Sequence, residues 1–372
     1  MRIVVAPDKF KGSLDAAAAA AAIAAGVRDV IPEATCELVP MADGGDGTVD
    51  AFLASGATPR TVRVTGPLGA PADATYARDH DTAIVEMAAA SGLVLVHDRR
   101  DARRATTRGT GELLRDALDG GATRIVLGIG GSATTDGGAG ALAALGARFL
   151  DDAGVALEPD PEALARVARI DLDALDPRLR AVDLAIACDV DNPLLGPAGA
   201  AAVYGPQKGA SREDVAFLDG VLARLADAMT AATGRDLRAV PGAGAAGGLG
   251  WALASACGAR LERGVALVAE VRGLPCVLEG ADWCFTGEGR IDAQTLRGKV
   301  VDGVAALARA AGVPVVAFGG IVDPAVEPAL RARGVRCVPI VPGPLSLEEA
   351  MRDAGTNLRA AASRVAVFLS GG

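Results

Sequence analysis

Short apolar segments, each followed by a polar stretch that contains glycine, recur along this chain and constrain its fold more than any other feature. They lie at residues 3–6, 36–40, 124–129, 183–187 and 314–318. Such short apolar runs with helical segments between them are typical of parallel β-strands that are buried on both faces. Aromatic residues make up only 3% of the chain, so Val, Leu, Ile and Ala must fill the core. The pattern predicts an α/β fold.

The order of the expected strands divides the chain into two domains. In the simplest architecture one five-stranded parallel sheet combines strands from both ends of the chain, at residues 3–6, 36–40, 281–285, 314–318 and 335–340. Short strands in residues 60–87 are joined by Gly, Pro and Asp turns, which predicts an antiparallel meander. We therefore predict a discontinuous α/β domain of residues 1–59 and 280–372, interrupted by a mixed α/β domain of residues 60–279.

Helices are expected between the strands. The clearest candidates are residues 13–30, 48–54, 110–118, 212–232, 300–311 and 347–369. Ser13 is expected to begin the first helix, with Asp15 inside its first turn. A hydroxyl there can cap the exposed N–H groups, and an acid complements the helix dipole.

Composition argues against several classes of protein. The net charge of -9 and the shortage of aromatic side chains disfavour nucleic acid as a partner. No segment is apolar over the length of a membrane span, and the N-terminus reads as a strand and a polar loop rather than a leader peptide. The six cysteines contain no CxxC pair, which disfavours a disulfide framework or a zinc site. We expect a soluble, cytoplasmic protein.

Lysine is rare, and its few occurrences are informative. Of the 37 basic residues, only four are lysines: Lys9, Lys11, Lys208 and Lys299. Each lies in or beside a polar stretch that contains glycine. In a chain so rich in Arg, these lysines mark positions where a compact ammonium is needed rather than a planar guanidinium. With the carboxylates and glycines near them, they indicate phosphate chemistry with a divalent metal. Chance clustering is the alternative.

Two of the lysines lie where a predicted strand leads into a predicted helix. In open α/β sheets ligands bind in the crevice at the carboxyl ends of the strands. Backbone N–H groups at a helix N-terminus favour an anion there, and Lys9, Lys11 and Ser13 would add to this effect. A helix cap with solvated lysines is the alternative.

Two glycine loops also follow predicted strands. The loop at residues 42–48 carries Asp43 and Asp46, whose carboxylates suit a metal or sugar hydroxyls, while its glycines let the backbone approach a ligand. The loop at residues 127–138 matches neither the dinucleotide fingerprint nor the P-loop. Its members Gly130, Gly131, Ser132 and Thr134 offer N–H groups and hydroxyls that could hold phosphate oxygens. A tight turn is the alternative for either loop.

Asp189 and Asp191 follow another apolar strand, in residues 188–192. Alternation places both acids on one side, and paired carboxylates suit Mg²⁺, which completes its shell with water and substrate phosphates. One of them could also accept the proton of an attacking hydroxyl; a simple turn is the alternative. Histidine is a poor candidate for that role, because His80 and His97 are expected in surface turns, and a Ser-His-Asp hydrolase is poorly supported.

Three further polar stretches complete the set. Lys208 introduces a helix and would serve an anion. Glu288, Arg290 and Lys299 follow a strand, where an arginine could grip a small carboxylate with both arms of its guanidinium. Residues 242–250 form a second flexible glycine loop and a candidate hinge.

In this order, the motifs resemble those of the bacterial type I glycerate kinases: PDKFKGS, MADGGDGT, GTGEL, GIGGSATTDGG, CDVDNP, QKGA, GAAGGLG and TGEGRIDAQTLRGK. The resemblance covers nearly the whole chain, and eight ordered motifs are far more specific than one glycine loop. Thr135 stands where we expect Asn in many relatives. The resemblance implies ATP-dependent phosphorylation of D-glycerate at the 2-hydroxyl, giving 2-phosphoglycerate. It also implies a flavodoxin-like domain made from both termini and a restriction-enzyme-like mixed domain between them.

This resemblance gives the residues hypothetical roles. Lys9, Lys11 and Ser13 would stabilise the migrating phosphoryl group, while Asp189 and Asp191 would place Mg²⁺ or activate the hydroxyl. The ATP phosphates would be held by Gly130, Gly131, Ser132 and Thr134, with Lys208. The substrate would be met by Asp43, Asp46, Glu288, Arg290 and Lys299.

Three alternatives stay open at this stage. The first is transfer to the 3-hydroxyl, the second a non-catalytic sensor of a sugar acid or nucleotide, and the third a metal-dependent phosphatase. The sequence does not fix the oligomeric state, and a homodimer is one option.

Overall fold

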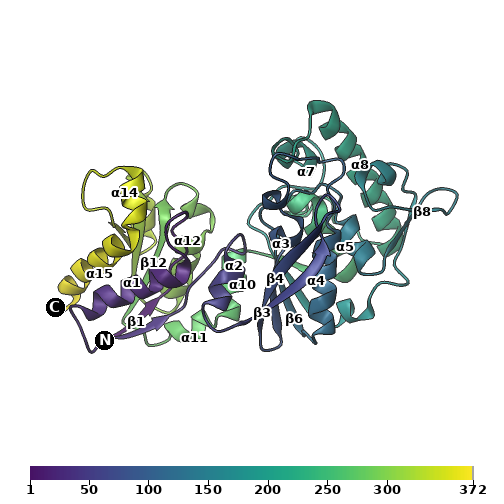
Figure 1. The fold of residues 1–372 in the computed structure, drawn as a ribbon. Helices are drawn as coiled ribbons and strands as arrows, with labels where there is room; N and C mark the ends of the chain where they lie inside the picture. Colours follow the sequence, from purple (N-terminus) through teal and green to yellow (C-terminus); the bar gives the residue numbers. More distant parts are fainter. Residues whose placement is uncertain (371–372) are drawn as a thin grey trace. The chain divides into compact units, whose positions relative to one another are not determined.

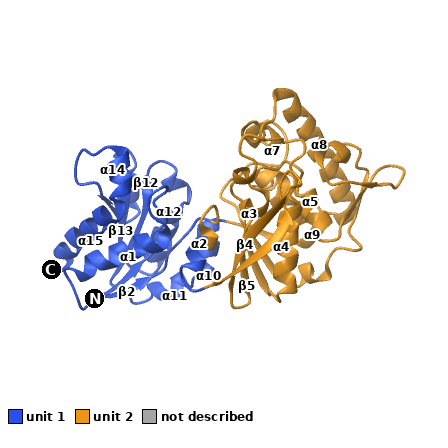
Figure 2. Cartoon of the chain, in the orientation of Figure 1, with its two compact units in different colours: residues 1–43, 50–56, 263–372 blue, residues 44–49, 57–262 orange. Residues whose placement is uncertain are grey.

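The computed structural model describes residues 1–370, which fall into two compact units (Figures 1 and 2). Unit 1 consists of residues 1–43 and 50–56 together with the chain from Arg263 on. Unit 2 consists of residues 44–49 and 57–262. Each unit combines helices with its own β-sheet, which confirms the predicted α/β class.

The sheet of unit 1 has five parallel strands in the order β14-β13-β12-β1-β2. Their bounds are β1 Arg2–Val5, β2 Thr35–Leu38, β12 Trp283–Ile291, β13 Val315–Val322 and β14 Val335–Pro339. Counted in chain order within the unit, this is the 2-1-3-4-5 order of flavodoxin-like sheets, so the sheet predicted from both chain ends is confirmed. The strand order reverses between β1 and β12, and open α/β sheets bind ligands at the carboxyl ends of the strands at such a point.

Helices accompany this sheet. They are α1 Ala16–Arg28, α10 Gly264–Val271, α11 Leu274–Leu278, α12 Val300–Ala310, α13 Glu327–Ala332, α14 Leu347–Arg352 and α15 Ala354–Ser370, with the short turn η5 Thr295–Arg297. The first and last of these, α1 and α15, lie side by side (Figure 1). Their buried faces, which include Ile23, Val27 and Leu358, complete one hydrophobic core with the sheet.

The predicted start of the first helix is wrong. Asp15 is the N-cap, because its carboxylate accepts a hydrogen bond of 2.7 Å from the N–H of Ala18. The hydroxyl of Ser13 donates instead to the carbonyl of Phe10 at 2.9 Å, within the preceding turn. The helix therefore begins at Ala16 rather than at Ser13.

The single helix predicted for residues 347–369 is also wrong, because the segment forms α14 and α15. Ser346 starts α14 with a capping box, in which its hydroxyl and the carboxylate of Glu349 cap each other's backbone N–H groups. Asp353, with φ of −98° and ψ of 13°, departs from helical geometry between the two helices. The apolar pattern runs across this break and does not reveal it.

Unit 2 contains a six-stranded sheet in the order β11-β10-β6-β5-β4-β3. The bounds are β3 Thr58–Thr65, β4 Pro71–Asp79, β5 Thr82–Glu86, β6 Arg124–Gly128, β10 Asp183–Ala187 and β11 Arg260–Glu262. The first three strands pair antiparallel, as the predicted meander requires, and β5, β6, β10 and β11 pair parallel. A small sheet of β7 Arg148–Leu150, β8 Ala156–Leu157 and β9 Arg169–Asp171 was not predicted.

The helices of unit 2 surround one large hydrophobic core. They are α3 Ala88–Ser91, α4 Arg108–Asp119, α5 Ala139–Ala144, α6 Pro161–Leu164, α7 Ala200–Tyr204, α8 Arg212–Thr233 and α9 Leu249–Cys257. Short 3-10 turns are η1 Leu93–Leu95, η2 Pro177–Arg180, η3 Pro206–Lys208 and η4 Ala245–Gly248. The long helix α8 agrees with the predicted residues 212–232, and a capping box at Ser211 fixes its start.

The limits of the units differ from the predicted domain limits at three places, the smallest of which is residues 57–59, which belong to unit 2. Residues 263–279 belong to unit 1, because α10 and α11 pack against α12. Residues 44–49 belong to unit 2, and helix α2 Thr48–Leu53 therefore starts in one unit and ends in the other. Within residues 1–370, no helix combines the length and the apolar character needed to cross a bilayer.

Candidate active site

In unit 1, polar side chains gather at the carboxyl ends of β1 and β12, where the strand order reverses. The turn after β1 is tied to β12, because the N–H of Asp8 donates to the carbonyl of Gly287 at 2.8 Å. Gly289 lets the two segments approach, since a Cβ there would lie 3.2 Å from the backbone nitrogen of Lys11. This is the predicted position of the ligand crevice in the unit 1 sheet.

Three carboxylates from three adjacent strand ends influence one another at this edge. The pKa of Asp8 is raised to about 7, chiefly by burial and also by the negative charges of Asp43 and Glu288. Burial also raises the pKa of Glu288 to about 7, against a hydrogen bond of 2.6 Å from the Thr295 hydroxyl and the charge of Lys299, which lower it. Groups that titrate near neutrality suit proton transfer.

The positively charged candidates of unit 1 differ in exposure. Lys9 and Lys299 are half-buried, whereas Lys11 and Arg290 are exposed. Lys299 is the N-cap residue of α12 and lies near Glu288, whose pKa it lowers. Unit 1 therefore brings together acids and ammonium groups from the first and the last predicted motif.

In unit 2, the two glycine loops pack on each other at the carboxyl end of β6. A Cβ on Gly128 would overlap the carbonyl oxygen of Gly44, and a Cβ on Gly130 would lie 3.2 Å from the Cα of Gly45. The N–H of Val49 donates to the Glu86 carboxylate at the end of β5, over 2.7 Å. Glycine is required at these contacts because the backbones touch.

The members of the glycine loop fall into an exposed and a buried part. Gly130 and Gly131 are exposed, Ser132 is 8% exposed, and Thr134 is fully buried. Asp46 is exposed in the adjacent loop and belongs to unit 2, whereas Asp43 belongs to unit 1. Surface groups for a ligand in this loop are thus concentrated at Gly130 and Gly131, with Ser132 just beneath the surface beside them.

Asp189 and Asp191 follow β10, and both are exposed. The side chain of Asn192 holds this loop together, since its amide donates to the Ala198 carbonyl at 2.9 Å and accepts from the Tyr204 hydroxyl at 2.6 Å. In the described part of the chain, no group of three or more His, Cys, Asp or Glu side chains is arranged to hold a metal ion. Mg²⁺ commonly uses one or two carboxylates plus waters and phosphates, so the Asp189–Asp191 pair fits such an ion in number and chemistry.

Lys208 lies inside unit 2, with only 1% of its surface exposed. Its ammonium donates to the carbonyl of Thr134 at 2.6 Å. Burial lowers the pKa of Lys208 to about 7, and the charge of Asp136 opposes that shift. The sequence correctly marks this lysine as unusual, but the structure places its ammonium on the backbone of the glycine loop.

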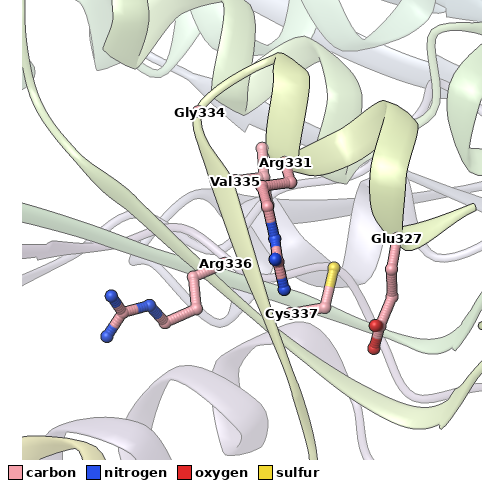
Figure 3. Close-up of a pocket in the computed structure, with 6 residues that line it drawn as sticks. All are labelled: Glu327, Arg331, Gly334, Val335, Arg336 and Cys337. Atoms are coloured by element: carbon pink, nitrogen blue, oxygen red, sulfur yellow. The ribbon is translucent and has the colours of Figure 1, made fainter.

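A separate cavity of about 530 Å³ lies beside α13 and β14 (Figure 3). It is lined by Glu327, Arg331, Gly334, Val335, Arg336 and Cys337, and Figure 3 shows Arg336 pointing away from Arg331, Glu327 and Cys337. Val335 begins β14, so this cavity starts at the amino end of the strand. The acids and lysines of unit 1 lie at the opposite end, where ligands of open α/β sheets bind.

Sequence reasoning overlooked three acids as site residues. Asp8 stands next to Lys9 in the first motif. Its position directly after β1 could have identified it as a site residue, as it did for Lys9. Glu86 ends β5, and Asp136 lies within the glycine loop, but their contacts depend on elements distant in the chain. Both histidines lie in exposed turns, as expected. The structure adds that both have positive φ, 54° at His80 and 44° at His97.

Comparison with known proteins places these motifs in context. The model of a family described as the glycerate kinase family matches residues 3–370. A glycerate kinase of Bacillus subtilis (strain 168) is 47% identical over 375 residues, which cover 99% of this chain and 98% of the relative. A glycerate 2-kinase of Escherichia coli (strain K12) is 43% identical over 376 residues, covering 100% and 98% of the two chains.

A solved structure supports the same relationship. The crystal structure of a protein from Salmonella typhimurium LT2 that was assigned as a glycerate kinase 2 superposes with a TM-score of 0.92 at 44% sequence identity. The superposition covers 100% of this chain and 99% of the other. Similarity in sequence and in fold therefore extends over both units.

Proposed function

Because the chain belongs to the glycerate kinase family, we propose that this enzyme transfers the terminal phosphoryl group of ATP to the 2-hydroxyl of D-glycerate, giving 2-phosphoglycerate and ADP. The family match over residues 3–370 supports glycerate as the substrate. The relative from E. coli, which is named a glycerate 2-kinase, supports the 2-hydroxyl as the acceptor.

The observation that carries the proposal is the cluster at the carboxyl edge of the unit 1 sheet. Phosphoryl transfer needs alignment and charge neutralisation more than covalent chemistry. Lys9 and Lys11 supply positive charge for the migrating phosphoryl group, together with the backbone of the turn that ends at Ser13. Arg290 and Lys299 bind the carboxylate of glycerate, and Glu288 and Asp43 bind its hydroxyls.

The hydroxyl of glycerate loses its proton when it accepts the phosphoryl group, and that proton needs an acceptor. Asp189 is the acceptor proposed from the sequence. Asp8 is a second candidate, which is favoured by its place beside Lys9 and by its pKa of about 7. Exchange of each acid for its amide separates the two.

We assign the ATP phosphates to the exposed Gly130 and Gly131 of the glycine loop and to the adjoining Ser132. Asp46 lies on the loop that packs against this one through Gly44 and Gly45. Asp189 and Asp191 would hold Mg²⁺ there, and the ion, when bound, neutralises phosphate charge. The residues of the loop itself orient the phosphate chain through backbone N–H groups.

The test is to incubate the protein with D-glycerate, ATP and Mg²⁺, to measure ADP, and to identify the product by ³¹P NMR. We expect ADP and 2-phosphoglycerate in equal amounts. A 3-phosphoglycerate signal would move the reaction to the other hydroxyl, and binding without ADP would indicate a sensor. Release of phosphate from phosphoglycerate without nucleotide would indicate a phosphatase.

Two broader expectations stay predictions. The six cysteines, all within residues 1–370, form no disulfide, which fits the reducing cytoplasm proposed for this enzyme. A homodimer is the simplest assembly to test by light scattering.

A further inference from the structure

We propose that Lys208 and Asp136 are positioning residues that hold the glycine loop in its ligand-binding shape from inside unit 2, without touching the ligand. The inference rests on the proposed function of residues 130–132 as the phosphate-binding part of that loop. It differs from the role that the sequence suggests for Lys208, which is direct contact with an anion.

Lys208 is enclosed by the protein and bonded to the glycine loop. Its ammonium is almost completely enclosed, at 1% exposure, and donates to the carbonyl of Thr134 at 2.6 Å. A buried carbonyl without a donor would be costly, and a bond from a charged group is stronger than one between neutral groups. The Lys208 side chain therefore anchors the loop two residues after Ser132.

Asp136 is fully buried in the same loop. Its carboxylate accepts four hydrogen bonds, from the N–H and hydroxyl of Thr107, both at 2.8 Å, from the N–H of Gly138 at 3.1 Å and from that of Gly140 at 3.2 Å. Four donors favour the charged carboxylate, although burial raises its pKa. Asp136 thus joins the loop to the starts of α4 and α5.

The backbone of residues 242–250 also packs on the loop. The N–H of Gly137 donates to the carbonyl of Gly247 at 2.9 Å. Gly247 has φ of 67°, and a Cβ there would overlap the same Thr134 carbonyl that Lys208 binds. The glycine-rich residues 242–250 are therefore a packed support for the first loop, whereas the sequence suggested a hinge.

The buried charges of Lys208 and Asp136 interact with each other. Asp136 is the charge that opposes the lowered pKa of Lys208, so each buried group offsets part of the other's desolvation. A planar guanidinium is larger and cannot replace a compact ammonium in an enclosed space of this kind. This gives a physical reason for a lysine at position 208 in a chain with so much arginine.

Reductive methylation of the unaltered full chain, read by mass spectrometry at the four lysines, tests the enclosure. We expect Lys208 to react about tenfold more slowly than Lys9, Lys11 or Lys299, with no further change on adding ATP, because reaction requires local opening. A Lys208 that reacts as fast as Lys11 and becomes protected by ATP is a direct ligand contact, and overturns the proposal.

Hydrogen exchange tests the positioning. In Lys208→Met and in Asp136→Asn, which keeps the shape of the side chain, we expect the amides of residues 130–138 to exchange about tenfold faster. Leu164→Ala, a core truncation in α6, is the control and should leave these amides unchanged when all proteins are compared at equal intervals below their Tm. Unchanged exchange in both loop variants contradicts the proposal.

Ligand binding separates this inference from the proposed function. By calorimetry, ATP should bind Lys208→Met about tenfold or more weakly than wild type, with D-glycerate affinity unchanged within about twofold. If wild type binds no ATP, the proposed function fails, while methylation and hydrogen exchange still decide the role of Lys208. Equal ATP affinity in wild type and both variants, together with faster loop exchange, also overturns the positioning role.

Discussion

At the scale of single residues, the acids at the carboxyl edge of unit 1 combine a chemical use with a cost in stability. Asp8 and Glu288 both have a pKa raised to about 7, chiefly by burial. The folded state therefore binds more protons than the unfolded state between about pH 4 and pH 7. The free energy of unfolding is therefore higher at low pH, where both carboxyls are protonated, and falls as the pH rises from about 4 to about 7.

Asp8→Asn removes the buried charge while its amide oxygen can still accept the Lys9 N–H, a bond of 2.7 Å in the native turn. We expect this variant to be more stable than wild type at pH 8, by about 1–3 kcal/mol, and to show no gain at pH 4. Urea denaturation at the two pH values measures it. Asp152→Asn, in an exposed loop, should change neither value, and a gain from Asp8→Asn at pH 4 equal to that at pH 8 would refute the electrostatic cause.

Lys9 and Asp189 carry the mechanistic proposal most directly. Lys9→Ala is expected to lower kcat about 10²–10³-fold, because a charge aimed at the migrating phosphoryl group is lost. Asp189→Asn should lower kcat to a similar extent if Asp189 places Mg²⁺ or accepts the proton. Steady-state kinetics with D-glycerate and ATP measures both, and near-normal turnover in both variants would remove these residues from the mechanism.

The sequence predicts a site residue where its local position in the chain is sufficient evidence, but not where its role depends on contacts with distant segments. Lys9 and Glu288 were predicted because each comes after a short apolar run, a position that indicates the ligand-binding edge. Lys9 does follow β1, whereas β12 is longer than predicted and contains Glu288 near its carboxyl end. The raised pKa of Asp8 was not predictable, since it comes chiefly from burial in the folded chain and then from the charges of Asp43 and Glu288, which are distant in sequence. Lys208 was recognised as unusual, but its enclosure depends on Thr134 and Asp136, more than 70 residues earlier.

At the scale of elements, α1 and α15 bring the two ends of unit 1 together. Gly26 lies at their crossing, and a Cβ there would overlap the carbonyl oxygen of Arg359 and lie 2.8 Å from the Cβ of Ala362. The two helices are also joined by a bidentate ion pair between Arg359 and Asp29, at 2.7 and 2.6 Å. The close approach, more than this exposed ion pair, fixes how the helices pack.

We expect Gly26→Ala to destabilise unit 1 by about 1–3 kcal/mol, because the added methyl forces the helices apart. Gly220→Ala in α8 is the matched control: a Cβ at Gly220 meets no atom within 4 Å, so the exchange should stabilise the protein by up to about 1 kcal/mol. Chemical denaturation followed by circular dichroism compares the two. A stabilising Gly26→Ala would show that the helices can separate without loss.

Helices and strands were predictable where apolar residues keep one regular spacing along the whole element. The strand at residues 183–187 and the helix from Arg212 were placed correctly, because each has a clear apolar pattern and flanking turn or cap residues. The strands of the small sheet are only two or three residues long, which is too short for any period to show. The break at Asp353 was missed because the apolar face continues across it.

At the scale of the whole molecule, the fold class follows from the alternation of strands and helices, but the limits of the units do not. Residues 263–279 form helices that could accompany either sheet, and their packing on α12 decides the matter. Residues 44–49 change units within a single motif, since Gly44 and Gly45 contact the glycine loop of unit 2. Such assignments depend on contacts between distant segments, which local pattern cannot supply.

The proposed division of ligands between the units leads to a prediction for the intact enzyme. Gly131 has φ of 71° and would place a Cβ 3.4 Å from that of Ala88, so Gly131→Val strains the phosphate-binding loop of unit 2. We expect this variant to bind ATP at least about tenfold more weakly and to bind D-glycerate normally. Arg290→Ala in unit 1 should show the opposite pattern, because a bidentate contact to the glycerate carboxylate is lost. Calorimetry with each ligand alone measures the four affinities, and if both variants lose the same ligand, the assignment of ATP to unit 2 and glycerate to unit 1 is wrong.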